Sequence, residues 1–270
     1  MRDDRVSIAV AGHVATVTMV RADKHNALDK GMFESLVAAA NRVAGERGVR
    51  AVVLCGEGPS FCSGLDVSVL GTDEGISPDE LARRTDRDLG NLPQRSALGW
   101  AALPMPVIAA VHGNCFGGGL QIALGTDIRI AAADARLSVL EVKWGLVPDM
   151  GITQTLIPLV APDVARELTW TGRVVNGEEA QSIGLVTHVA GDPLAAARDL
   201  AGEIAARSPD AVRAAKQLYR EAPRRSVADA LWLETELQTD LIGSPNQIAA
   251  VVAGMKKEPP EFTDPKPATG

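Results

Sequence analysis

The sequence is poor in aromatic residues and in cysteine. Phe, Trp and Tyr make up 3% of the 270 residues, so the core must be built mainly from Ala, Val, Leu and Ile. The three cysteines, Cys55, Cys62 and Cys115, are odd in number and form no Cys-x-x-Cys pair. This pattern argues against a disulfide framework or a zinc site, and it predicts a reducing, cytoplasmic location.

The chain also lacks an excess of basic residues and any long apolar run. Lys and Arg number 27 against 34 Asp and Glu, which gives a net charge of −7. This balance argues against non-specific binding to nucleic acid, although backbone dipoles still allow an anionic ligand. No apolar run approaches the roughly 20 residues that span a bilayer. The charged first five residues show no signal-peptide core, so neither a membrane span nor a secretory segment is expected.

Short apolar segments alternate with helical patterns along the chain. Residues 6–10 and 14–20 predict a hairpin, and residues 49–55, 106–111 and 128–132 predict strands. Asp29 is predicted to cap a helix whose apolar residues recur at helical spacing. Residues after 160 are mostly helical in pattern, with Ser-Pro starts and a predicted capping box at Asn176. The alternation predicts an α/β architecture.

Two glycine-containing loops follow the buried strands. Gly117-Gly118-Gly119 lies between a predicted strand and a short helix, and Ser63-Gly64-Leu65-Asp66 follows an earlier strand. Glycines let a backbone approach a ligand closely, and a helix start presents free N–H groups. Two such loops can form an oxyanion hole, which stabilises negative charge on a carbonyl oxygen. The alternative is that both are ordinary turns.

The chain resembles the crotonase superfamily of enoyl-CoA hydratases and isomerases from about Val6 to Phe262. The resemblance rests on three segments in order, residues 21–28 (Arg-Ala-Asp-Lys-His-Asn-Ala-Leu), 61–66 (Phe-Cys-Ser-Gly-Leu-Asp) and 117–119 (Gly-Gly-Gly). They are similar to the family's first coenzyme A contact and its two oxyanion loops. The resemblance implies a spiral of β-β-α units in residues 1–195 and a C-terminal helical region in 196–270, which covers the site and forms a homotrimer or a dimer of trimers.

The resemblance also implies a set of ligand contacts. The N–H groups of Leu65 and Gly118 would be the oxyanion donors, and Lys257 with Phe262 would reach a ligand on a neighbouring subunit. No cofactor is implied beyond the acyl-coenzyme A thioester, which is the substrate. Ser68 stands where the family usually has a lysine, which puts its phosphate contact in doubt. The other implied contacts with coenzyme A or substrate are Lys24, His25, Ala27, Gly64, Asp66, Val67, Gly117 and Trp144.

The acid and base groups depart from the hydratases of that family, which use two glutamates. Gln121 occupies the first position, and an amide can orient a group but cannot transfer a proton at neutral pH. Glu141 occupies the second, in an apolar run that would raise its pKa and suit a proton shuttle. Alternatively, Glu141 pairs with Lys143 or Arg136.

Asp149 is a second candidate acid or base, since the dienoyl-CoA isomerases resemble this chain in having an aspartate there. It could instead cap a helix that starts near Gly151. One carboxylate above an oxyanion hole favours double-bond isomerisation of an enoyl-CoA, with Glu141 as the acid and base. The alternatives are a true hydratase in which Gln121 orients the water, and a non-catalytic relative that binds acyl-CoA or RNA.

Overall fold

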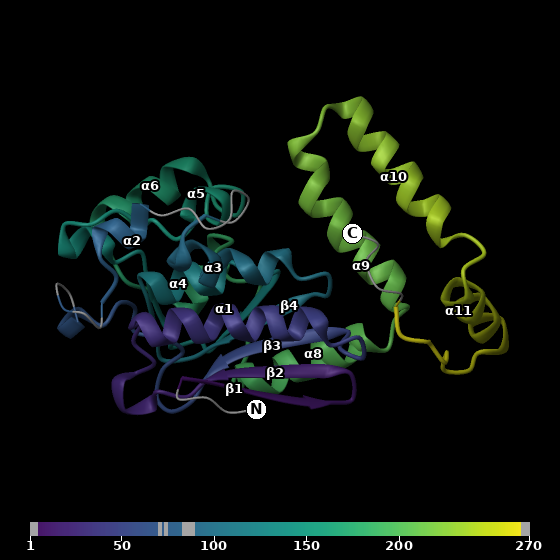
Figure 1. The fold of residues 1–270 in the computed structure, drawn as a ribbon, viewed down its shortest axis with the longest axis horizontal. Coiled ribbons are helices and arrows are strands. Elements are labelled where there is room, and N and C mark those ends of the chain that lie inside the picture. The colour runs from purple at the N-terminus through teal and green to yellow at the C-terminus, as the bar shows by residue number, and fades with distance from the viewer. Residues whose placement is uncertain (1–4, 70–71, 73–74, 83–89, 266–270) are drawn as a thin grey trace.

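The computed structural model describes residues 5–69, 72, 75–82 and 90–265. Figure 1 shows a layered core beside an arm formed by the last three helices. Within these residues the larger sheet has the strand order β1-β2-β3-β4-β6-β9, and a smaller sheet has the order β5-β7-β8. The strands are β1 (Val6–Ala11), β2 (Val14–Met19), β3 (Ala51–Gly56), β4 (Val107–Val111), β5 (Asn114–Phe116), β6 (Ile128–Ala131), β7 (Arg136–Ser138), β8 (Val175–Asn176) and β9 (His188–Val189).

The predicted hairpin and buried strands are present. β1 and β2 pair antiparallel, and every other pair of neighbours in the larger sheet is parallel. Parallel strands in the middle of a sheet are buried on both faces, which explains the apolar sequences of β3 and β4. Val52 and Leu54 of β3 face the main core, whereas Val53 faces Ala197 and Ala201 of α8 (Pro193–Ala205) on the opposite side. The α/β expectation is therefore confirmed.

Most helices begin at the residues that the sequence indicates. Asp29 caps α1 (Lys30–Gly45) by accepting from the N–H of Met32 at 2.7 Å. Asn176, Ser208 and Ser226 likewise accept from backbone N–H groups at later helix starts. The remaining helices are α2 (Pro78–Ala82), α3 (Leu92–Ala102), α4 (Gly118–Leu124), α5 (Ile152–Thr155), α6 (Pro162–Thr171), α7 (Gly177–Ser182), α9 (Pro209–Glu221), α10 (Val227–Leu241) and α11 (Pro245–Lys256).

The sequence also predicts a loosely amphipathic helical stretch up to about residue 102 and a disordered end to the proline-rich tail that starts at Pro259. Both expectations fall partly outside the described residues. The helical stretch expected before residue 102 appears as α2 and α3, and residues 83–89 between them are not described. The disordered end expected for the tail likewise concerns residues 266–270, which are not described. The tail before that point is bound to α11, since the N–H of Thr263 donates to Asn246 Oδ1 at 2.9 Å.

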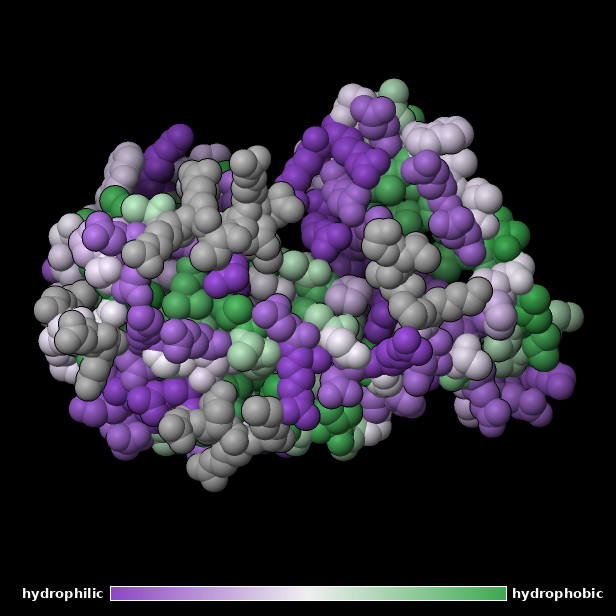
Figure 2. Space-filling view, in the orientation of Figure 1, coloured by the Kyte–Doolittle hydropathy of each residue, from purple (hydrophilic) through white to green (hydrophobic). Residues whose placement is uncertain are grey.

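The C-terminal arm docks on the core through α9. Lys216 Nζ donates to the carbonyl oxygens of Trp100 and Met105 and binds the carboxylate of Asp127 at 2.7 Å. α8 spans the predicted boundary at residue 195 and packs against the sheet. No helix in the described ranges is both long and apolar enough to cross a membrane. Figure 2 shows apolar residues on the outer side of the arm. The exposed apolar side chains of α10, α11 and the segment between them include Leu231, Trp232, Ile242, Val251, Val252 and Met255.

Candidate active site

Two loops that follow neighbouring parallel strands lie side by side at the site. We call residues 57–66 the first loop and residues 112–119, which open α4, the second loop. The pairing of β3 with β4 continues into them, because Phe61 N–H donates to the His112 carbonyl at 2.8 Å. Further along, Cys62 N–H donates to Asn114, and Phe116 N–H donates back to Cys62, both at 3.0 Å. The strands thus hold the two glycine segments at one edge of the sheet.

Glycine is required where the two loops touch. A Cβ on Gly64 would lie 2.7 Å from the Phe116 carbonyl oxygen, and a Cβ on Gly119 would lie 2.6 Å from the Cys62 carbonyl oxygen. Gly64 also has a φ of +88°, which residues with side chains rarely adopt. The loops therefore pack backbone against backbone.

Each loop contributes one predicted oxyanion donor residue to the lining of the same pocket. Leu28 N–H donates to the Gly64 carbonyl at 2.8 Å, and Asp66 N–H donates to the Leu28 carbonyl at 2.9 Å. These two bonds fix both sides of Leu65 and leave its own N–H without a partner among the described residues. Gly118 is the first residue of α4, so its N–H has no acceptor within the helix. Both residues line the pocket, where such donors can bind an oxygen that gains negative charge.

The pocket has a volume of about 590 Å³. Its lining includes polar side chains, among them Lys24, His25 and Asp66, and is otherwise largely apolar. The apolar lining was not predicted, because no local pattern distinguishes it from ordinary core: Phe33, Val69, Ile76, Leu81, Pro93, Phe116, Leu140, Leu146, Val147 and Met150. Of the residues that the sequence nominated, those that line the pocket are Lys24, His25, Ala27, Gly64, Leu65, Asp66, Val67, Gly117, Gly118, Gln121, Glu141, Trp144 and Asp149.

Three nominated residues do not line this pocket. The Ser68 hydroxyl donates to Asp66 Oδ1 at 2.5 Å, so it supports the first loop from outside. Lys257 is the C-cap residue of α11, and the carbonyl of Phe262 accepts from Arg50 at 3.0 Å. The role expected for Lys257 and Phe262 involves a neighbouring subunit and stays a prediction.

Glu141 receives one side-chain hydrogen bond from the described part of the chain. It begins the 3₁₀ turn Glu141–Trp144, and Gln121 Nε2 donates to its Oε1 at 2.7 Å. Its Oε2 is buried and has no hydrogen-bond partner in the described part of the chain. Burial raises the pKa of Glu141, and the charge of Asp149 adds to this rise. Hydrogen bonds from the backbone of Glu141 and Leu140 and from the Gln121 side chain oppose it. The carboxyl group is therefore suited to accept and return a proton.

The alternative pairings of Glu141 do not form. The Arg136 guanidinium lies over the Phe116 ring at 5.6 Å, and Lys143 Nζ lies over the Trp144 ring at the same distance. No ion pair between Glu141 and either cation occurs among the described residues. The interpretation of Glu141 as a surface ion-pair partner is wrong.

Gln121 is held at both ends of its amide. It lies on α4 with 1% of its surface exposed, and its Oε1 accepts from the Met150 N–H at 2.9 Å. This bond fixes which end of the amide is oxygen, so the Nε2 must face Glu141. The sequence predicted that Gln121 orients a ligand, but its visible partner is Glu141. The orientation of the Gln121 amide depends on the Met150 N–H, which lies 29 residues further along the chain. No local sequence pattern therefore indicated Glu141 as the partner.

Asp149 is not a helix cap. α5 is capped by Gly151, which has no side chain to accept a bond, so the capping interpretation is wrong. The Asp149 carbonyl accepts from Gln94 Nε2 at 3.2 Å, and the residue lines the pocket. The surrounding protein raises the pKa of the Asp149 carboxyl by desolvation. Asp149 and Glu141 therefore form a pair of acidic groups on one pocket wall.

Comparisons with known proteins agree with this geometry. Residues 10–265 match the enoyl-CoA hydratase/isomerase family. Human mitochondrial Delta(3,5)-Delta(2,4)-dienoyl-CoA isomerase is 36% identical over 246 residues, which are 86% of this chain and 75% of that protein. Enoyl-CoA hydratase EchA19 of Mycobacterium tuberculosis is 32% identical over 253 residues, 93% of each chain. The crystal structure of an enoyl-CoA hydratase from Bacillus anthracis superposes with a TM-score of 0.87 at 28% identity, covering 96% of this chain and 99% of that one.

Proposed function

The chain belongs to the enoyl-CoA hydratase/isomerase family and has the crotonase fold, and from this premise we propose that it moves a double bond along the acyl chain of an enoyl-CoA thioester. One observation carries the proposal. Glu141 keeps a buried, unpartnered Oε2 at the pocket, and the neighbouring position holds Gln121, whose amide is bound at both ends. One proton-transfer group then serves both halves of the reaction.

The proposed steps balance without a further reactant. The thioester oxygen of a 3-enoyl-CoA binds the N–H groups of Leu65 and Gly118. Glu141 takes a proton from C2, and the electron pair of that C–H bond forms an enolate conjugated with the double bond. The same carboxylic acid then gives the proton to C4, and the product is a 2-enoyl-CoA. Loss of one such oxyanion donor typically slows a reaction by about 100- to 1,000-fold.

Asp149 favours a second candidate substrate, a conjugated dienoyl-CoA. Moving two double bonds requires proton removal and delivery at carbons farther apart than one carboxyl group reaches. Asp149 and Glu141 line the same pocket, and both have raised pKa values. Asp149 would take or give the proton at the distal carbon, while Glu141 would act near the thioester.

Hydration is the competing function, and one experiment separates it from isomerisation. A hydratase needs a base for water and an acid for the α-carbon, and Gln121 supplies neither. Purified protein is given 3-hexenoyl-CoA, a 3,5-dienoyl-CoA or crotonyl-CoA, and the absorbance of the conjugated thioester is followed. Isomerisation raises or shifts this absorbance, whereas hydration of crotonyl-CoA removes it. Rapid hydration of crotonyl-CoA with no turnover of the other two would reject the proposal.

A non-catalytic role is tested in the same assay. If the protein only binds acyl-CoA, these thioesters would raise its Tm, and none of them would be converted. RNA binding would require a basic surface, and the net charge of −7 argues against it.

Several further features belong to the proposal. Lys24, His25 and Ala27 line the pocket and would contact coenzyme A. The exposed apolar side chains of α10 and α11 suit assembly into a trimer or a dimer of trimers. The proton transfers are redox-neutral, so the thioester is the one ligand that the scheme requires. Three free, buried cysteines suit the cytoplasmic location that we propose.

A further inference from the structure

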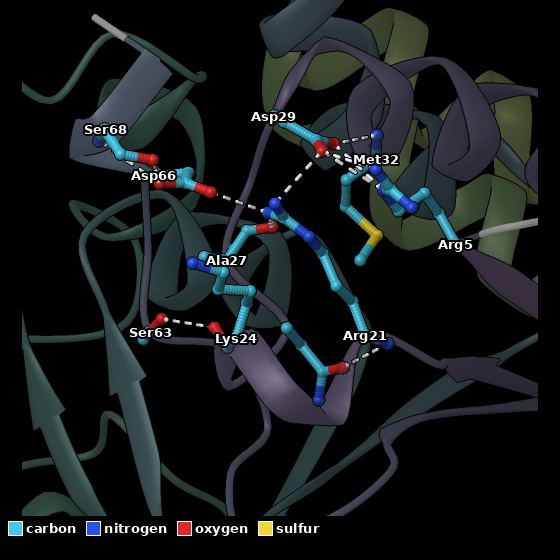
Figure 3. A network of polar contacts seen from close by, with 10 residues as sticks. Arg5, Arg21, Lys24, Ala27, Asp29, Met32, Ser63, Asp66 and Ser68 are labelled. Atoms are coloured by element: carbon cyan, nitrogen blue, oxygen red, sulfur yellow. Dashed lines mark hydrogen bonds and ion pairs between the residues drawn. The ribbon is translucent and has the colours of Figure 1, made fainter.

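Arg21 links two segments of the thioester site, the coenzyme A segment at Ala27 and the first loop at Asp66. Its Nη1 donates to the Ala27 carbonyl at 2.9 Å and lies 2.9 Å from Asp66 Oδ2, while its Nη2 lies 3.4 Å from Asp29 Oδ2. Figure 3 shows the guanidinium between the two carboxylates. Arg21 does not line the pocket, and its side chain is 14% exposed. It therefore acts on a ligand only through the residues that it holds.

Each of those residues controls a different part of the site. Ala27 lies in the segment proposed to bind coenzyme A. Asp66 directly follows Leu65, whose N–H is a proposed oxyanion donor. Asp29 caps α1 by accepting from the Met32 N–H. A planar guanidinium can hold a carbonyl and a carboxylate in fixed relative positions, which a point charge does less well.

The Asp66 carboxylate depends on this contact. Burial acts to raise the pKa of Asp66, and the bonds from Ser68 and Arg21 outweigh burial and lower it. Ser68 occupies Oδ1 with both its hydroxyl and its N–H. Without Arg21, Oδ2 would be a charged atom with no counterion, and the first loop would have to turn it toward water.

We propose that Arg21 is a positioning residue that fixes the Leu65 N–H relative to the coenzyme A segment at Ala27. The inference rests on the proposed oxyanion hole. It assigns Arg21 an effect on the polarisation of the bound thioester, beyond any effect on folding. A misplacement of about 1 Å can reduce a rate by about 100-fold, so a measurable effect on kcat is expected.

The chain contains a matched control for the purely structural explanation. Arg5 binds Asp29 as well, with its Nη2 2.9 Å from Oδ2. Arg5→Met weakens the same capped helix start but leaves the contacts of Arg21 with Asp66 and Ala27 in place. Figure 3 shows that Arg5 and Arg21 approach Asp29 as separate groups.

The test compares Arg21→Met, Arg21→Lys and Arg5→Met in the full-length protein. The readouts are Tm, kcat and KM with the isomerisation substrate, and the red shift of enzyme-bound cinnamoyl-CoA, whose conjugated thioester reports polarisation of its carbonyl. Arg21→Met is expected to lower kcat by about 10- to 100-fold and to reduce the red shift at saturating ligand. Arg21→Lys should restore part of both. Arg5→Met should lower Tm and change neither.

The outcomes separate this inference from the proposed reaction. If Arg21→Met binds cinnamoyl-CoA with the wild-type red shift and retains kcat, Arg21 is only structural and the inference is wrong. If Arg21→Met does not fold, Arg21→Lys and Asp66→Asn are decisive, and a wild-type red shift in both overturns it. A wild type that shifts cinnamoyl-CoA but isomerises nothing refutes the proposed reaction alone, and a loss of that shift in Arg21→Met then supports the inference. A wild type that produces no shift refutes both.

Discussion

Replacing Gln121 by Met tests how the protein controls the proton affinity of Glu141. Methionine has a similar length but cannot donate to Glu141 Oε1, which now receives a bond at 2.7 Å. The site is 1% exposed at Gln121, so water is not readily available as a substitute donor. Glu141 Oε2 has no partner of its own in the described residues. The change therefore removes the side-chain donor that stabilises the ionised carboxylate.

The direction and size of the effect follow from that bond. Donation from Gln121 lowers the pKa of Glu141 against the rise caused by burial, so its loss raises this pKa further. A hydrogen bond to a charged group contributes about 1.5–3 kcal/mol, and about 1.4 kcal/mol is a tenfold change in an equilibrium. The ratio of ionised to protonated Glu141 should thus fall by about 10- to 100-fold. The base must be ionised to start the reaction, so kcat/KM should fall by that factor on the acid side and recover as pH rises.

The assay is the pH profile of kcat/KM, which reports ionisation of the free enzyme. Gln154→Met is the control, because Gln154 is exposed and its Nε2 donates to the neighbouring Thr153. Gln121→Met also removes the acceptor of the Met150 N–H, so a stability loss of about 1–3 kcal/mol should accompany it. If folded Gln121→Met gives a profile that superimposes on the wild type, Gln121 does not tune Glu141.

Three other substitutions have defined outcomes. Glu141→Gln should abolish turnover and keep acyl-CoA binding. Because burial raises the pKa of Glu141, ionisation of this carboxyl group opposes folding above that pKa. The variant should therefore have a higher Tm than the wild type at pH 8, with a smaller gain at pH 5. Asp149→Asn removes the charge that raises the pKa of Glu141, so the acid limb of kcat/KM should move to lower pH, opposite to Gln121→Met; an unmoved limb would contradict the coupling. Gly119→Ala places a Cβ 2.6 Å from the Cys62 carbonyl and should lose about 1–3 kcal/mol of stability in a thermal melt. The control Gly202→Ala on α8 places a Cβ with nothing within 4 Å and should not destabilise the protein. Equal melting temperatures of the two variants would show that the loops can separate freely.

Features encoded by short stretches of sequence were predictable. The hairpin at residues 6–19, the cap at Asp29 and the strands that precede both loops follow from periodicity and from single residues at fixed offsets. The glycines of the loops were also informative, since Gly64 and Gly119 stand where backbone meets backbone. For the hairpin, the cap and the strands, neighbouring residues carry the physical cause, whereas the backbone that requires each glycine lies elsewhere in the chain.

Features that depend on distant contacts were not predictable. Arg21 lies in residues 21–28, which carry the family resemblance, but its contact with Asp66 spans 45 positions of the chain. Its charge alone does not distinguish it from the other arginines. Asp149 precedes a helix by a spacing typical of a cap, but the capping rule failed because Gly151 occupies the cap position and Asp149 lines the pocket. Local sequence rules give the interactions that a residue can make with its neighbours in the chain, and tertiary packing decides which of these interactions form.

The site separates charge stabilisation from proton transfer. The proposed donors at Leu65 and Gly118 are backbone groups held by strand pairing, so their positions do not depend on the side chains that move protons. Glu141 lies against the same backbone, with its Oε1 3.3 Å from where a Cβ of Gly117 would be. A carboxyl at this distance can serve a thioester bound to Gly118. The identity of the reaction is then decided by the groups beside the hole, and in this chain those are one tuned carboxyl, one amide that cannot ionise and a second carboxyl farther along the wall.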